Sequence, residues 1–294
     1  MTLKTYHQVG GGCPIIDGPI DETGGEPRKL GLLLPKEFPS VYVKFADAVP
    51  LLDEATIRKI LDDPSRKSGR NRFGPDYTKD QNSRGACQGY ASAGCVERAR
   101  VRRGLAHIKI SGDFAYCLVN GGNDSGSHLA GGMVAAEKEG YCTEDTVNKH
   151  GKRHEYRKNL FPHECFTEAQ RFKGFEGYHV DTKQELLTAI SLDYDVVVAV
   201  QAGGSGGLDQ YGICQWGNGS GNHAVLCDDA VYDTRLGDYK FDHQNSWGTR
   251  WGVQGRSYLT FERHFQQSIR VHRFYAIRST MDDPQGDNPP APKP

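Results

Sequence analysis

Four side chains in this sequence have the types and spacing needed for nucleophilic attack on a carbonyl group. Cys87 follows a polar, glycine-containing stretch and begins a segment of helical composition, and the free amides at a helix start favour the thiolate. Gln81 lies six residues earlier, where its side-chain amide could donate a hydrogen bond to an oxyanion. His223 at the head of an apolar strand and Asn245 beside two tryptophans could supply a base and the group that orients it.

Each of these residues also has a structural interpretation. A buried, unreactive thiol is the commonest state of cysteine, so Cys87 by itself indicates no chemistry. His223 could pack in the core at a strand start, and Asn245 could cap a strand at a turn. His243, two residues before Asn245 and on the same strand face, is a second candidate for the base. The case for chemistry therefore rests on the whole set of residues.

The order of this set resembles that of the papain-like cysteine peptidases. The matching elements are Gln81, Cys87, Asn222-His223-Ala224 and Asn245-Ser246-Trp247-Gly248, followed by Trp251-Gly252. The separation of His223 from Cys87 falls within the roughly 130–150 residues of papain-type enzymes, and the asparagine comes later still. His243 ranks below His223 because it lacks the alanine that follows the histidine in this pattern.

The resemblance implies an α+β, two-lobed papain-like fold. An N-terminal helical lobe would carry Cys87, and a C-terminal, antiparallel, partly closed sheet would carry His223, with the active-site cleft between them. We expect the peptidase domain over residues 75–280, preceded over residues 1–74 by an extension that serves as a prosegment or an interaction arm. The proline-rich composition of residues 281–294 favours a disordered tail.

The resemblance also implies a role for each site residue. Cys87 would act as the nucleophile, His223 as the general base and then the general acid, and Asn245 as the group that orients the imidazole. The side chain of Gln81 would contribute to the oxyanion hole. Substrate-binding positions carried over from the family are Ser125, Gly126, Asn222 and Trp247. This chemistry requires no metal ion and no organic cofactor.

Two positions beside the nucleophile depart from the family pattern. Arg84 stands where many members have a cysteine that forms a nearby disulfide, which agrees with a reducing compartment. Gln88 follows the nucleophile where a tryptophan is usual, so the wall beside the sulfur is expected to be more polar. Neither change removes a catalytic group, and the chain is interpreted as a divergent member.

Local patterns predict the elements that hold the site. A long helix is expected from Cys87 to a stop near Gly104, with small residues that allow close packing on both sides. A second helix of small residues is predicted over about 129–138, and a buried strand over about 195–200. Further strands are predicted over 223–231, 239–244, 256–261 and 270–278. Residues 140–182 give no clear pattern.

Bulk composition limits the classes of function. The formal net charge of −1 argues against nucleic-acid or membrane-surface binding, which normally requires a basic excess. An arginine cluster over residues 98–103 is interpreted as the solvated C-terminal end of the long helix. The N-terminus lacks the apolar core of a signal peptide, which predicts a cytoplasmic, virion-associated or complex-associated protein. The eight cysteines are therefore expected to be free thiols.

The function that these observations favour is a cysteine-type endopeptidase acting on a peptide or protein substrate. A structural or assembly protein that keeps the scaffold, such as a virion or large-complex component, is the main alternative. Its motivation is that the N-terminal arm and the proline-rich tail are suited to lying on protein partners. An amidase acting on cell-wall peptides with the same cysteine–histidine chemistry is a third hypothesis, although the Asn-Ser-Trp-Gly segment fits it poorly.

Overall fold

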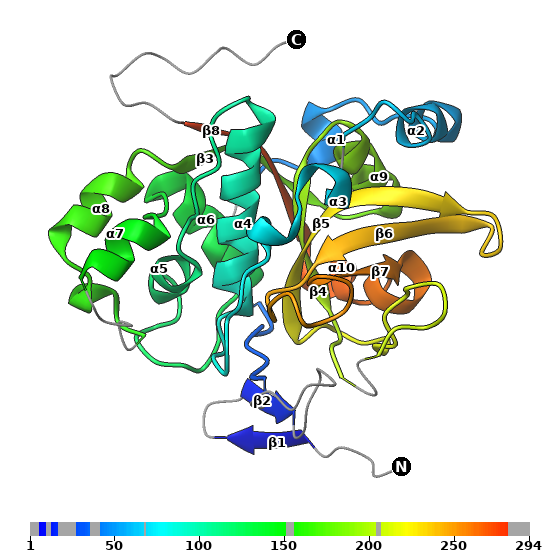
Figure 1. Cartoon of the computed structure of the whole chain (residues 1–294). Coiled ribbons are helices and arrows are strands. Elements are labelled where there is room, and N and C mark those ends of the chain that lie inside the picture. Colours follow the sequence, from blue (N-terminus) through cyan, green and yellow to red (C-terminus); the bar gives the residue numbers. More distant parts are fainter. Residues whose placement is uncertain are drawn as a thin grey trace.

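The computed structural model has a helical lobe and a sheet lobe that lie side by side (Figure 1). It describes residues 6–9, 13–16, 28–35, 42–67, 69–150, 156–203 and 207–281. The proline-rich tail and much of the first 27 residues therefore lie outside the described residues. Within the described part, the helices come first along the chain and most of the sheet follows, which confirms the predicted α+β class.

The helical lobe is built around one long helix. Its helices are α4 (Cys87–Arg102), α5 (Gly112–Cys117), α6 (Leu129–Lys138), α7 (Glu144–Lys149) and α8 (His163–Ala169), with 3-10 turns at Pro75–Tyr77 and Lys158–Leu160. Helix α4 contacts α5 and α6 on one side and strands β5 and β8 on the other. Nearly all of α4 is buried, which explains why its first half is rich in small residues.

The sheet lobe contains six antiparallel strands. They are β3 (Lys173–Val180), β4 (Asp195–Val200), β5 (His223–Asp233), β6 (Asp238–Gln244), β7 (Arg256–Thr260) and β8 (Phe274–Met281), in the spatial order β3-β8-β4-β5-β6-β7. The apolar run of β4 lies in the middle of this order, between β8 and β5, and every residue of it is buried. Helices α9 (Lys183–Ser191) and α10 (Ser268–His272) pack on β4.

Most predicted elements are confirmed, one is corrected, and one strand was not predicted. Helix α6 and strand β4 have the predicted bounds. The strand predicted over 270–278 is wrong in its first part, because residues up to His272 form α10 and the strand begins at Phe274. Strand β3 was missed, because its residues lack an alternating apolar pattern and are ordered by long-range pairing with β8.

The N-terminal region contributes to the sheet lobe before the family-like segment begins. Strands β1 (Tyr6–Val9) and β2 (Cys13–Ile16) pair with each other, and α1 (Phe45–Ala48), α2 (Glu54–Leu61) and α3 (Gly69–Arg72) follow. Phe45 and Ile57 are buried in the main core, and both of their helices contact α9. The chain from α1 onward is therefore part of the packed lobe.

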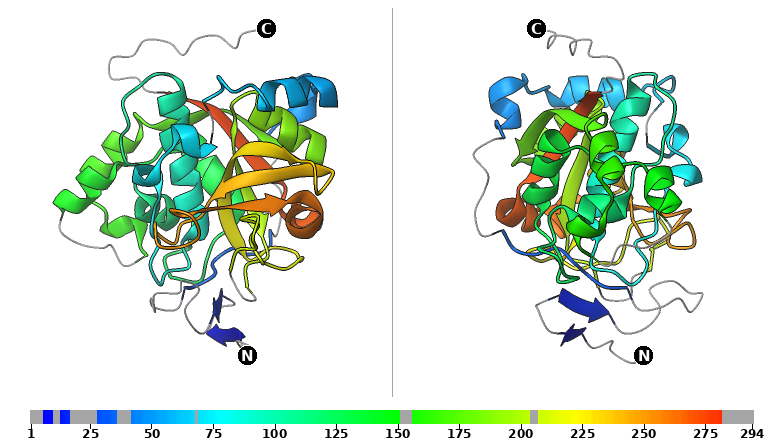
Figure 2. Two further views of the ribbon diagram at one scale, coloured as in Figure 1. Left: turned by 45° about the vertical axis from the view of Figure 1, so that its right-hand side comes forward. Right: turned by 90° about the vertical axis from the view of Figure 1, so that its left-hand side faces the viewer.

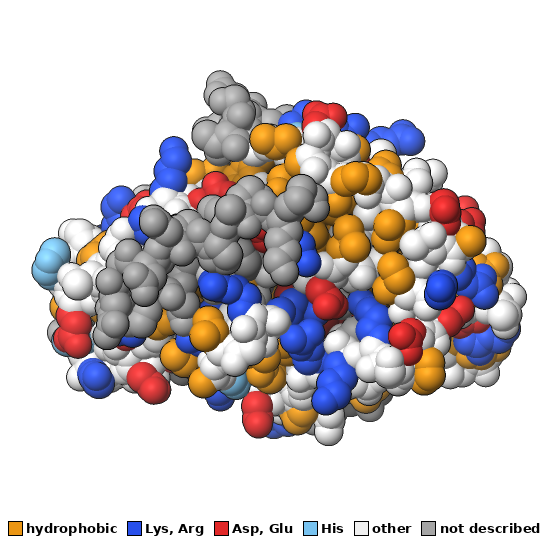
Figure 3. Space-filling model, turned by 90° about the horizontal axis from the view of Figure 1, so that it is seen from above, with side chains coloured by type: hydrophobic (Ala, Val, Ile, Leu, Met, Phe, Trp, Pro, Cys, Tyr) orange, Lys and Arg blue, Asp and Glu red, His pale blue; other side chains and the backbone are white. Residues whose placement is uncertain are grey.

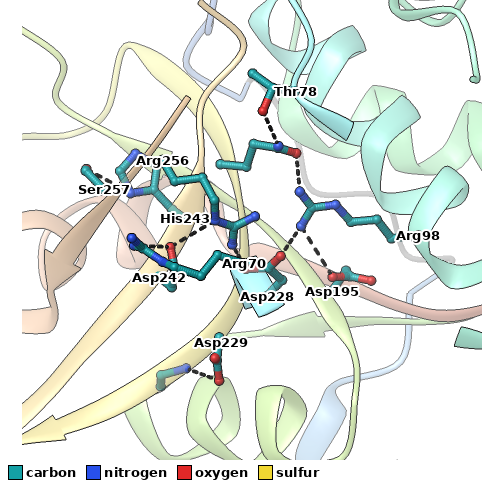
Figure 4. A network of polar contacts seen from close by, with 12 residues as sticks. Arg70, Thr78, Arg98, Asp195, Asp228, Asp229, Asp242, His243, Arg256 and Ser257 are labelled. Carbon is teal, nitrogen blue, oxygen red and sulfur yellow. Dashed lines mark hydrogen bonds and ion pairs between the residues drawn. The ribbon is translucent and has the colours of Figure 1, made fainter. Parts of the chain in front are cut away.

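A buried network of charges joins α4 to the sheet (Figure 4). Arg98 pairs with Asp228 on β5 and donates to Gln244 on β6. Arg256 on β7 also pairs with Asp228, so this carboxylate lies between two guanidinium groups. The interpretation of the arginine cluster as a solvated helix end is thus wrong for Arg98 and Arg100, which are 1% and 4% exposed. The charge of Arg98 is tolerated because paired acids compensate for the lost hydration.

The surface seen from above carries acidic and basic side chains interspersed with apolar ones (Figure 3). Among the described residues, no helix is both long and apolar enough to cross a membrane. The cysteines whose side chains the structure describes are buried free thiols.

Candidate active site

Cys87 is the first residue of α4 and is completely buried. The N-cap residue Ala86 provides no side-chain cap, so the first amides of the helix are available to the thiol. Burial raises the pKa of Cys87 to about 11, although the backbone amides of Ala224, Gly31 and Gln88 point to the sulfur and oppose this shift. The amides of Ala224 and Gln88 would favour the thiolate once the sulfur became solvated.

His223 begins β5 and is held by the asparagine predicted to orient it. Its Nε2 lies 2.8 Å from Oδ1 of Asn245, and since Oδ1 accepts, we assign the proton to Nε2. Nδ1 is buried and has no hydrogen-bond partner within the described residues. Burial lowers the pKa of His223 to about 4, against the opposing effect of Asn245. The free nitrogen therefore carries a lone pair that can take a proton.

Helix α4 meets strand β5, and this contact places the Cys87 sulfur beside the start of β5, where His223 lies. The amide of Ala224, the residue that follows His223, points to the Cys87 sulfur. Trp247 stacks on the His223 ring, with ring centroids 4.6 Å apart and an angle of 28° between planes. The indole thus covers one face of the His223 ring, and we expect it to exclude water from the hydrogen bond to Asn245.

Gln81 lies in the loop ahead of Cys87, and both polar atoms of its side chain have hydrogen-bond partners within the protein. Its Oε1 accepts from the Ser246 hydroxyl at 2.6 Å, which orients the amide nitrogen away from that serine. Nε2 donates to the carbonyl of Arg84 at 2.7 Å and to that of Lys29 at 3.2 Å. The amide predicted to stabilise an oxyanion thus binds a peptide carbonyl from the N-terminal part of the chain.

That carbonyl belongs to a stretch, residues 28–33, that we call the bridging segment. The amide of Leu32 donates to the carbonyl of Asn222 on the sheet lobe at 3.1 Å. The amide of Leu33 donates to the carbonyl of Ser127 on the helical lobe at 3.0 Å, and the amide of Ser127 donates to Gly31 at 2.8 Å. Figure 2 shows this part of the chain in blue, along the lower edge of both lobes.

Charged contacts hold the start of the bridging segment. Lys29 pairs with Asp124 at 2.8 Å, and Arg28 donates to the carbonyl of Trp247 at 3.2 Å and pairs with Asp80. Further along, the side chains of residues 30 and 32 are buried leucines. The segment therefore binds by backbone hydrogen bonds, apolar burial and ion pairs, in the manner of an extended peptide ligand.

The predicted substrate-binding residues lie around this segment. Asn222 contacts it through its carbonyl, and Gly126 packs on it, since a Cβ built on Gly126 would lie 2.3 Å from the Gly31 carbonyl oxygen. The Ser125 amide instead donates to the Asn123 side chain. The backbone that pairs with the segment is that of Ser127, which sequence reasoning missed. Its place two residues before the predicted helix over 129–138 was the one available signal.

The two departures from the family pattern have clear partners. Arg84 pairs with Asp113 and donates to the Tyr90 hydroxyl at 3.0 Å, so an ion pair fixes the loop ahead of Cys87. Gln88 is buried and donates to Ser92.

Within the described ranges, no group of three or more His, Cys, Asp or Glu side chains could hold a metal ion.

The two-lobed fold, with a thiol at a helix start and an imidazole held by an asparagine, defines the class of papain-like cysteine proteases. The model of the papain family cysteine proteases matches residues 67–277. The chain therefore belongs to the papain family, whose members act on peptides. No curated protein sequence matches it significantly.

Solved structures of cysteine proteases share the fold at low identity. Xylellain from Xylella fastidiosa is 17% identical, with a TM-score of 0.63, over 85% of this chain and 96% of its own. A procathepsin B from Trypanosoma congolense is 16% identical, with a TM-score of 0.56, over 86% of each chain. The Carica candamarcensis protease CMS1MS2 in complex with E-64 is 17% identical, with a TM-score of 0.52, over 69% of this chain and 92% of its own.

Proposed function

We propose that this chain is a cysteine endopeptidase that its own bridging segment keeps latent. The observation that carries the proposal is the arrangement around the sulfur. The Cys87 thiol lies at a helix start under the Ala224 amide, and His223 directs its bonded nitrogen to Asn245 and keeps the other free. A thiol and a base prepared in this way are suited to covalent acyl transfer.

In the proposed reaction, Nδ1 of His223 takes the thiol proton and Cys87 attacks the carbonyl carbon of the peptide. The amide of Gln81 and the backbone amide of Cys87 stabilise the resulting oxyanion. The intermediate collapses with cleavage of the carbon–nitrogen bond, and the imidazolium protonates the leaving amine. His223 then takes a proton from water, which attacks the thioester and releases the acid and the thiol.

Latency is supported by what the bridging segment occupies. Its Lys29 carbonyl takes the Gln81 amide, and its Gly31 amide points to the Cys87 sulfur. A substrate needs the same two groups, so it cannot bind while the segment is in place. Helices α1 and α2 pack on α9 of the sheet lobe, so the inhibitory part is the chain ahead of α1 and not the whole of residues 1–74.

Labelling with a peptidyl epoxide of the E-64 type tests the proposal. We expect the full-length chain to react slowly, and to react rapidly once limited proteolysis has removed the residues ahead of α1. Intact mass should show one adduct per chain, and Cys87→Ala should abolish it while Cys95→Ala does not. An adduct that survives Cys87→Ala would refute Cys87 as the nucleophile.

A structural or assembly protein that retains the scaffold is the second candidate, and one observation favours it. The Gln81 amide and the faces that hold Leu32 and Leu33 are already used by the chain itself. A permanently filled site would need no catalysis. This candidate predicts that no epoxide adduct forms even after the residues ahead of α1 are removed.

A further inference from the structure

Gln88, the residue that follows the nucleophile, is a fully buried polar side chain with specific partners. Its Nε2 donates to the Ser92 hydroxyl at 3.1 Å, one turn later in α4. Its Oε1 accepts from the Ser127 hydroxyl at 3.0 Å. The amide thus connects the helix of the nucleophile to the loop that ends at α6.

Ser127, the second partner of Gln88, links this amide to the bridging segment. Ser127 uses its backbone amide and carbonyl to hold the bridging segment through Gly31 and Leu33. Through the Ser127 hydroxyl, Gln88 therefore contacts the residue whose backbone pairs with an extended peptide. Any change in the position of Ser127 relative to Cys87 changes how that peptide lies over the sulfur.

The Gln88 side chain is also held in place by α6. A Cβ built on Gly132 of α6 would lie 1.3 Å from the Gln88 nitrogen, so the helix backbone packs directly on the amide. The Tyr141 hydroxyl lies within hydrogen-bond distance of the Gly132 carbonyl and of the Ser92 hydroxyl, and so fixes both neighbours of the amide. Gln88 therefore has no room to turn away from Ser127.

We propose that Gln88 is a positioning residue that sets the spacing between the Ser127 backbone and Cys87. It determines how tightly the lobe interface holds an extended peptide, first the bridging segment and, where the proposed peptidase function holds, a substrate. It touches neither peptide nor sulfur through its side chain, and acts through the Ser127 hydroxyl.

Hydrogen exchange of the full-length chain tests the proposal without requiring catalysis. In Gln88→Met, which keeps the size of the side chain but loses the amide, the Leu33 amide should exchange about two- to tenfold faster than in wild type. Ser127→Ala should give the same increase. The double variant should add little to either single change, because both remove the same bond. Alkylation of Cys87 by iodoacetamide should accelerate in parallel.

Ser92→Ala is the matched control, because it removes the other hydrogen bond of Gln88 and leaves Ser127 in place. Unchanged Leu33 exchange in folded Gln88→Met and Ser127→Ala would overturn the proposal, as would equal acceleration in Ser92→Ala. If Gln88→Met does not fold, Ser127→Ala alone decides. Failure of epoxide labelling would remove the peptidase function and leave the exchange result standing.

On a peptide substrate, the same variants give a second measurement. After removal of the residues ahead of α1, Gln88→Met and Ser127→Ala should raise KM with little change in kcat, because the backbone pairing is equal in ground and transition states. Ser92→Ala should leave both constants near their wild-type values. A fall in kcat at constant KM would contradict a positioning role through Ser127.

Discussion

Gly31 is the residue at which a single methyl group should open the site. A Cβ on Gly31 would lie 1.7 Å from the carbonyl oxygen of Gly85 and 2.2 Å from its carbonyl carbon. Both are backbone atoms, and the Gly85 amide is held by Asp124 at 2.9 Å, so the loop ahead of Cys87 cannot easily retreat. Gly31→Ala must therefore push the bridging segment outward by more than an ångström.

The magnitude follows from the hydrogen bonds that such a shift breaks. They are the bonds from Leu32 to Asn222, from Leu33 to Ser127 and from Ser127 to Gly31. At a net value of about 1 kcal/mol each, their loss weakens docking by roughly 2–4 kcal/mol. The population with an open site should then rise about 30- to 700-fold, and the rate at which Cys87 reacts should rise with it.

The assay is the rate of carboxamidomethylation by iodoacetamide, followed by intact mass on the full-length chain. Cys87→Ala in the Gly31→Ala background identifies the reacting sulfur. Gly74→Ala is the control, since a Cβ there would meet no atom within 4 Å. A folded Gly31→Ala chain that reacts at the wild-type rate would show that the segment does not occlude Cys87.

Three further predictions concern pH and the buried charges. Because burial raises the pKa of Cys87 to about 11, the alkylation rate of the full-length chain should rise about tenfold per pH unit between about 7 and 10, and a plateau near pH 8.5 would contradict this. Burial lowers the pKa of His243 well below its usual value, so the folded state excludes a proton that the unfolded state binds below about pH 6.5. Stability contributed by the neutral ring is therefore present above that pH and is lost as the pH falls. His243→Phe should reduce the slope of the unfolding free energy against pH by about 1.4 kcal/mol per pH unit below that point. An unchanged slope, measured by urea unfolding at several pH values, would refute this prediction. Asp228→Asn should lower the unfolding free energy by about 3–5 kcal/mol, because it leaves two guanidinium groups without their shared carboxylate. The surface variant Asp62→Asn should lower it by less than about 1 kcal/mol. Equal losses in urea unfolding would contradict a stabilising role of the buried network.

Much of the fold could be predicted because its signals are local. The valine-rich run of β4 and the small residues of α6 each specify their element within a few residues, and the element bounds agree with the structure. The start of α4 at Cys87 follows in the same way from a polar stretch that gives way to helix-forming residues. Strand β3 could not be found, because its order comes from β8, which lies far along the chain.

Within the site, the sequence alone determined which groups are available for chemistry. The identities and order of Cys87, His223 and Asn245 are covalent facts, and the His223–Asn245 hydrogen bond agrees with the roles assigned to them. The tertiary structure alone decided what surrounds them. Arg98 became a buried ion-pair partner, and Ser127 became the backbone that pairs with the chain's own extended segment. These outcomes depend on which distant segments pack together, and residue spacing carries no record of such contacts.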